Sequence, residues 1–183
     1  SPNAQEGTGF TKAGKNNKTI VSRNTINAFV DLMPEDSLKI FDINLRQHYF
    51  SEEIVCNSMN KADILKINDE EIIVVAEMLN ITGKSQKEIC EVLLDRFALK
   101  MVILTCGDKG SYVLTAEESS WVDTPKVNVV STVGAGDSFT GTFIASILLG
   151  KTIRQAHEAA VRVSAYVCTC QGAMPAIPQD LLF

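Results

Sequence analysis

The sequence has few of the residues that several classes of functional site require. It contains two histidines, His48 and His157, so a metal site or catalytic triad built on histidine is not expected. Lysine and arginine total 17 against 22 acidic residues, and the net charge of −5 leaves no basic surplus for nucleic-acid binding. No apolar run reaches the length that crosses a bilayer, so a membrane-spanning segment is not expected.

The cysteines also lack a recognisable pattern. There are five, an odd number, and their spacings match no zinc site. Most lie in or beside apolar stretches, as buried thiols do in a reducing compartment. Cys168 and Cys170 have the spacing of a redox or metal pair, but no other cysteine or histidine cluster supports that interpretation. We therefore expect free thiols and a cytoplasmic protein.

Apolar periodicity predicts strands that alternate with helices. Strands are expected at Leu38–Ile43, Ile64–Ile67, Met101–Thr105, Tyr112–Leu114 and Val127–Val130. Helices are expected before Pro34, over Ser51–Met59, after Asn68, after Ser85, over Asp137–Leu149 and over about Ile153–Thr169. This order is typical of βαβ units, so we predict an α/β fold with a mainly parallel sheet covered on both faces. Residues 1–21 are polar and glycine-rich and are expected to be a flexible leader or junction before a domain over 22–183.

A glycine-rich turn is expected between the strand Val127–Val130 and the next helix. It reads Ser131-Thr132-Val133-Gly134-Ala135-Gly136-Asp137. The first N–H groups of a helix have no partner inside it and, with the positive end of the helix dipole, bind phosphate. Asp137 at the helix entrance would stay ionised and accept a proton from a hydroxyl. A plain capped junction, with Asp137 serving only the helix dipole, is the alternative.

Three further polar groups follow predicted strands. In chain order they are Asp42, Asn44 and Arg46, then Asn68 and Glu71, then Thr105, Gly107 and Gly110. Ligands of such sheets bind beyond the C-terminal ends of the strands, so we expect one site at this edge. Asn68 and Glu71 lie one helical turn apart, and their oxygens suit Mg²⁺ or its waters. An ordinary first helical turn rich in acids is the alternative.

Together these motifs resemble those of the PfkB, or ribokinase-like, family of carbohydrate kinases. Residues 132–137 match six of the seven positions of its signature, Asp-Thr-x-Gly-Ala-Gly-Asp. Four other segments are similar to family motifs: Asp42-x-Asn44-x-Arg46, Asn68-x-x-Glu71, Thr105-x-Gly107-x-x-Gly110 and Gly172-Ala173-x-Pro175. The resemblance runs from about Ser22 to Pro178, and the first of these segments looks like fructokinase and 2-keto-3-deoxygluconate kinase relatives.

The resemblance implies a three-layer α/β/α ribokinase-like fold and ATP-dependent phosphorylation of a sugar hydroxyl. It implies that Asp137 is the general base and that the N–H groups of Gly134, Ala135 and Gly136 form the anion hole. Phosphoryl transfer needs mostly positioning and charge stabilisation, which agrees with these parts.

The resemblance also assigns the remaining residues. Mg²⁺ and phosphate would be organised by Asn68 and Glu71, with water between these residues and the metal. The nucleotide would contact Thr105, Gly107 and Gly110. The phosphates or the sugar would face Asp42, Asn44 and Arg46. The full-length protein is expected to be a homodimer that binds a small sugar and neither nucleic acid nor membrane.

Two departures from the family pattern carry expectations. Ser131 replaces the leading Asp of the signature, a position near a monovalent-cation site in relatives, and it brings no charge. We therefore expect little K⁺ activation. Family members are also considerably longer, and the segment that supplies most of the sugar pocket and a small β-lid has no counterpart here. The chain is thus expected to be the C-terminal, nucleotide-binding portion of a kinase. A non-catalytic nucleotide-binding or assembly module derived from such a kinase is the alternative.

Overall fold

The computed structural model describes residues 21–45 and 50–182. The described residues divide into two compact units between Ser37 and Leu38. In the first unit residues 21–31 are helical, and the helix ends before Pro34 as predicted. Residues 1–20 and Arg46 lie outside the described residues, so the predicted boundary after residue 21 and the role of Arg46 stay predictions. No helix in the described part of the chain is both long enough and apolar enough to span a bilayer.

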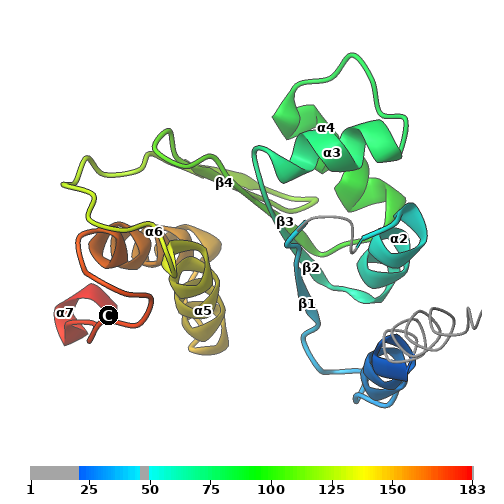
Figure 1. Ribbon diagram of the computed structural model, residues 1–183, viewed down its shortest axis with the longest axis horizontal. Helices are drawn as coiled ribbons and strands as arrows, with labels where there is room; N and C mark the ends of the chain where they lie inside the picture. The colour runs from blue at the N-terminus through cyan, green and yellow to red at the C-terminus, as the bar shows by residue number, and fades with distance from the viewer. Residues whose placement is uncertain (1–20, 46–49, 183) are drawn as a thin grey trace, which may run out of the picture. The chain divides into compact units, whose positions relative to one another are not determined.

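The second unit is built on a five-stranded sheet with the order β1-β2-β3-β4-β5. The strands are β1 (Ile40–Asp42), β2 (Ile64–Asn68), β3 (Met101–Thr105), β4 (Ser111–Leu114) and β5 (Ser119–Val122). The first three pair in parallel, whereas β4 is antiparallel to both of its neighbours. Consequently β1, β2, β3 and β5 run in one direction, and their C-terminal ends reach the same edge of the sheet (Figure 1).

Helices cover both faces of this sheet (Figure 1). One face carries α2 (Glu52–Lys61), α3 (Glu71–Met78) and α4 (Gln86–Arg96), and the other carries α5 (Ala135–Leu148) and α6 (Ile153–Cys168). A short helix, α7 (Gln179–Leu182), follows α6. Alternating residues of β2 explain the two cores, because Leu65 and Ile67 pack toward α2–α4 while Ile64 packs toward α5 and α6. The predicted three-layer α/β/α architecture is confirmed.

Local capping signals fix where several helices begin. The Ser85 side chain accepts a hydrogen bond from the Glu88 N–H, and the Glu88 carboxylate accepts one from the Ser85 N–H, which is the predicted capping box. Ser51 caps α2 by accepting from the Ile54 N–H. A second capping box, formed by Thr152 and Gln155, starts α6. These short polar patterns place the helix starts within the order that the sequence predicts.

The predicted strand over Val127–Val130 was wrong. In the described chain this segment is irregular, and the side chains of Val129 and Val130 are 61% and 56% exposed. The place beside β4 is taken by β5, whose Trp121 ring packs against Tyr112 in a tilted arrangement, with 4.3 Å between ring centroids. β5 follows β4 after a short turn, so it closes a much smaller loop than Val127–Val130 would. The glycine-rich turn therefore connects an irregular segment, not a strand, to α5.

Candidate functional site

A cavity of about 870 Å³ lies at the C-terminal edge of the sheet. Its lining includes these predicted site residues: Asn68, Thr105, Gly107, Gly110, Ala135 and Gly136. They come from the ends of β2 and β3, from the turn between β3 and β4, and from the start of α5. The structure thus brings together three groups that are far apart in the sequence, at the edge where the strand pattern predicts a site.

The start of α5 depends on a glycine at the N-cap. Gly134 has φ of 85°, in the left-handed region, and a Cβ built there would lie 2.4 Å from the Ala173 carbonyl oxygen. Only glycine accommodates both the conformation and the close approach. This contact joins the signature segment to the Gly172-Ala173-x-Pro175 loop, so two motifs that were recognised separately meet in space.

Several backbone N–H groups at this helix start form no hydrogen bond with any residue that the structure describes. Among the described residues no hydrogen bond engages the N–H of Gly134, Gly136 or Asp137, whereas the Ala135 N–H donates to the Thr132 carbonyl at 3.2 Å. Of the three N–H groups in the predicted anion hole, the one of Ala135 is therefore already hydrogen-bonded within the turn. The free N–H groups add to the positive end of the α5 dipole, which favours a bound anion.

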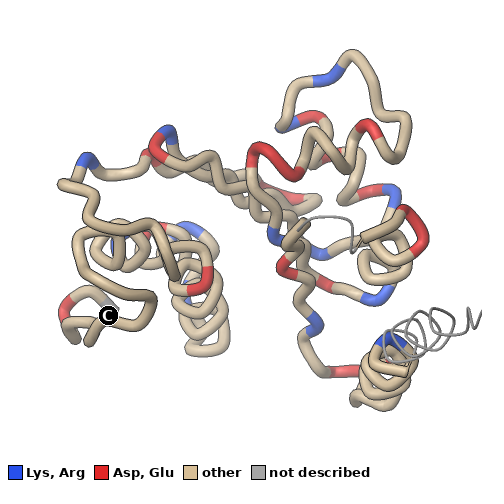
Figure 2. Tube along the Cα trace, in the orientation of Figure 1, with Lys and Arg blue, Asp and Glu red and all other residues tan. Residues whose placement is uncertain are grey.

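Asp137 occupies the first turn of α5 and is exposed. It lies next to the cavity-lining Gly136 but is not itself part of the lining. It is the only charged residue between Lys126 and Lys151. Elsewhere both signs of charge are spread over the described chain (Figure 2). A lone carboxylate beside unpartnered N–H groups is suited to accept a proton next to a bound anion.

Asn68 and Glu71 fix the backbone where two strands end. The Glu71 carboxylate accepts the N–H groups of Leu45 at 3.2 Å and Asn68 at 3.1 Å. The Asn68 side-chain oxygen accepts the N–H groups of Glu70 and Glu71. The N-cap position of α3 is nevertheless Glu70, not Asn68 as predicted, because residues 69 and 70 form a turn before the helix begins. These bonds hold the chain after β1 against the chain after β2.

The same residues bear on the fit of Mg²⁺. In residues 21–45 and 50–182 no group of three His, Cys, Asp or Glu side chains could hold a metal ion. Mg²⁺ usually keeps several waters and takes few protein ligands. Asn68 lines the cavity, and its remaining lone pairs fit contact with Mg²⁺ through water, while Asp69 and Glu70 add negative charge to the lining. Glu71 lies outside the lining, and both of its carboxylate oxygens accept backbone N–H groups.

The other predicted ligand residues are less exposed to the cavity. Asn44 is exposed but lies outside the lining, and Asp42 lies outside it too. Asp42 Oδ2 accepts a hydrogen bond from the Thr140 hydroxyl at 2.9 Å. Asp42 Oδ1 is buried and accepts no hydrogen bond from the described residues, so its pairing with Lys66 Nζ at 3.1 Å is one of charge alone. The sequence alone does not identify Lys66 as a residue of the site. The available signal was a charged residue inside the apolar strand Ile64–Asn68.

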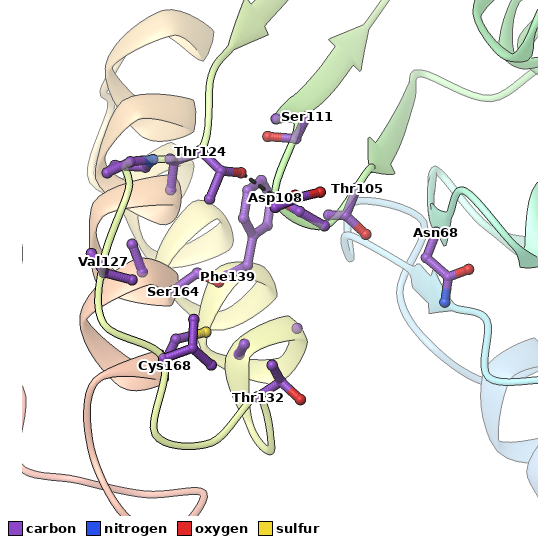
Figure 3. A pocket seen from close by; sticks show the side chains of 18 of the residues that line it. Asn68, Thr105, Asp108, Ser111, Thr124, Val127, Thr132, Phe139, Ser164 and Cys168 are labelled. Carbon is purple, nitrogen blue, oxygen red and sulfur yellow. Dashed lines mark hydrogen bonds between the residues drawn. The ribbon is translucent and has the colours of Figure 1, made fainter.

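The remaining wall of the cavity was not predicted. It is formed by residues 124–127, by Val129 and by one face of α6 that carries Val161, Ser164, Ala165 and Cys168. Val127, Ser164 and Cys168 line one side of the cavity, and Thr105 and Asn68 the other (Figure 3). The signal on α6 was a row of small side chains at helical spacing. The Thr124 hydroxyl donates to the Gly107 carbonyl at 2.7 Å and so ties this wall to the β3–β4 turn.

A buried polar cluster supports the cavity from behind. His157 is fully buried, with Nε2 at 2.8 Å from the Ser111 hydroxyl and Nδ1 at 2.9 Å from the Ser120 hydroxyl. Its ring packs edge-on against Phe139, which lines the cavity. Burial lowers the pKa of His157 to about 4, and the nearby charge of Arg154 contributes to this lowering. His157 is therefore neutral near pH 7 and joins β4, β5 and α6.

A cavity beyond parallel strand ends, next to a glycine-rich helix start, is typical of α/β proteins that bind phosphorylated ligands. Comparison with known proteins defines the class further. Residues 26–180 match the pfkB family of carbohydrate kinases, and the chain belongs to this family. Its ribokinase-like fold is likewise shared with solved members.

Three relatives illustrate the similarity. Probable fructokinase-3 of Arabidopsis thaliana is 28% identical over 157 residues, which cover 79% of this chain and 44% of the relative. The fructokinase of Vibrio cholerae O395, solved with fructose, ADP and calcium ion bound, has a TM-score of 0.74 at 28% identity, covering 88% of this chain and 55% of that one. The ribokinase of Thermotoga maritima has a TM-score of 0.72 at 27% identity, and the match covers 86% of this chain and 51% of the ribokinase. The chain thus spans about half the length of these relatives.

Proposed function

We propose that this chain is the nucleotide-binding and catalytic portion of an ATP-dependent sugar kinase of fructokinase type. The observation that carries the proposal is the start of α5, where unpartnered N–H groups and the exposed Asp137 stand beside the cavity. Membership of the pfkB family supports the reaction class. The similarity to a fructokinase solved with fructose and ADP supports a sugar as acceptor.

The roles follow from the chemistry of phosphoryl transfer. A sugar hydroxyl oxygen attacks the γ-phosphorus of ATP, the bond to the β-phosphate oxygen breaks, and ADP leaves. Asp137 takes the hydroxyl proton. The N–H groups around Gly134–Gly136 and the dipole of α5 stabilise the negative charge on the transferring group, which is where preorganised donors contribute most.

The remaining residues bind and orient the nucleotide. We assign Thr105, Gly107 and Gly110 to nucleotide contacts, because they line the cavity at the β3–β4 turn. Asn68 and Glu71 would hold Mg²⁺ through water, and that ion would neutralise charge on the ATP phosphates. Asn44 and Arg46 would face the sugar or the phosphates. We further propose that the full-length protein is a homodimer and that it is cytoplasmic. The five free cysteines support the cytoplasm, where thiols stay reduced.

Turnover by the full-length gene product tests this proposal. The protein is mixed with MgATP and a panel of sugars that includes fructose and ribose, and ADP release is followed by a coupled assay. We expect saturable turnover with at least one sugar. If MgADP binds but no sugar supports turnover, the non-catalytic nucleotide-binding module is the better account.

A further inference from the structure

Lys66 places a buried ammonium group against the first turn of α5. Its side chain is only 9% exposed, because it belongs to β2, which lies inside the sheet between β1 and β3. A Cβ built on Gly136 would lie 3.2 Å from Lys66 Nζ, so the absence of a side chain at Gly136 leaves room for the ammonium. The charge therefore lies directly beside a residue of the proposed anion hole.

A chain of polar contacts links this ammonium to α5. Lys66 Nζ lies 3.1 Å from Asp42 Oδ1, and Asp42 Oδ2 accepts a hydrogen bond from the Thr140 hydroxyl at 2.9 Å. The same hydroxyl lies 3.0 Å from the Gly136 carbonyl oxygen. The end of β1 and the middle of β2 are thus joined to the turn of α5 that carries Gly136 and Asp137.

Packing alone does not explain a buried ion pair at this position. Burying an ion pair loses hydration energy, and an apolar side chain of similar size packs a core equally well. The carboxylate of Asp42 alone would also oppose anion binding at the adjacent helix start. An ammonium that neutralises Asp42 removes this repulsion and leaves the dipole of α5 unopposed.

We propose that Lys66 is a positioning residue for phosphoryl transfer. By neutralising Asp42, it keeps the Asp42–Thr140 contact in place, fixes the first turn of α5, and lets that turn accept the γ-phosphoryl group. The inference rests on the proposed function, because the anion is taken to be the transferring group of ATP. It also changes the predicted role of Asp42. Instead of contacting the ligand directly, Asp42 holds Thr140 of α5 in place next to the anion hole.

The test compares Lys66→Met, Asp42→Asn and the double variant in the full-length protein. Measured are kcat with a sugar acceptor and the Kd values of MgATPγS and MgADP by calorimetry. We expect Lys66→Met to lower kcat about 10- to 100-fold, by analogy with other supporting groups of active sites. We expect it to weaken MgATPγS about tenfold and MgADP less than twofold. In the double variant Asp42→Asn should restore much of both losses, because the uncompensated charge is gone.

Lys100→Met is the matched control. Lys100 pairs with Asp63 at 2.9 Å before β3, at the opposite edge of the sheet. It should change none of the three quantities more than twofold. The inference is overturned if Lys66→Met, still folded by circular dichroism, binds both nucleotides as the unmodified protein does, or if the double variant is no better than Lys66→Met. Absent turnover in the unmodified protein would refute the proposed function separately, since the nucleotide affinities still test Lys66.

Discussion

Replacing Gly134 by alanine perturbs the contact on which the site depends most. Alanine in the left-handed region costs roughly 1–2 kcal/mol. The new Cβ would also lie 2.4 Å from the Ala173 carbonyl oxygen and 2.8 Å from its Cα, so the loop that carries Ala173 must move. Overpacking of this kind adds roughly 1–3 kcal/mol, for a total of about 2–5 kcal/mol. At roughly 2–4 °C per kcal/mol, the Tm should fall by at least about 4 °C.

Gly141→Ala is the control in the same helix. Gly141 is exposed in the middle of α5, and a Cβ there meets nothing within 4 Å. Alanine should stabilise this position by up to about 1 kcal/mol and raise the Tm. Both variants are compared by thermal unfolding and by MgATPγS affinity, and only Gly134→Ala should lose affinity. If Gly134→Ala kept the Tm and affinity of the unmodified chain, the argued contact with Ala173 would not exist.

Two further predictions concern pH and monovalent cations. Because the pKa of His157 is about 4 in the folded chain, against an ordinary value of 6.5 for an exposed imidazole, the unfolded chain binds a proton that the folded chain does not. The free energy of unfolding should therefore fall as the pH drops from about 6.5 to about 4, by on the order of 3 kcal/mol in all. Chemical denaturation across this range should show that slope, and His157→Gln should flatten it; an equal slope in both proteins would contradict the assignment. At position 131, the full-length protein should turn over equally well in K⁺ and in a bulky organic cation at fixed ionic strength. Ser131→Asp should create a preference for K⁺, and strong K⁺ activation without this substitution would show that backbone ligands suffice.

The elements that the sequence predicts well are those with their own local signals. β3 has the predicted bounds, Met101–Thr105, because five apolar or β-branched residues are followed, after Cys106, by the turn that begins at Gly107. Ser85 and Glu88 form the predicted capping box because both partners lie within one helical turn. Parallel strands with polar ends then predict which edge of the sheet holds the cavity.

The features that the sequence does not reveal depend on partners far along the chain. Val127–Val130 has the composition of a strand, but composition does not say which neighbour is available, and β5 occupies the edge beside β4. Lys66 looks like an exception within an apolar strand. Its burial makes sense only once Asp42 and Gly136 are placed around its ammonium. The cavity wall formed by α6 also depends on distant partners and is not predicted by the sequence. Small residues such as Ser164 occur equally at ordinary contacts between helices.

The central claim is that Asp137 is the base of a sugar kinase, and Asp137→Asn tests it most directly. The control is Asp180→Asn, which removes another exposed carboxylate from a first helical turn, in α7. In the full-length protein, kcat with the best sugar and the Kd of MgADP are measured for both. We predict that Asp137→Asn lowers kcat by roughly 10²- to 10⁴-fold with the MgADP affinity nearly intact, and that Asp180→Asn changes neither. A kcat for Asp137→Asn close to that of the unmodified protein would contradict the account.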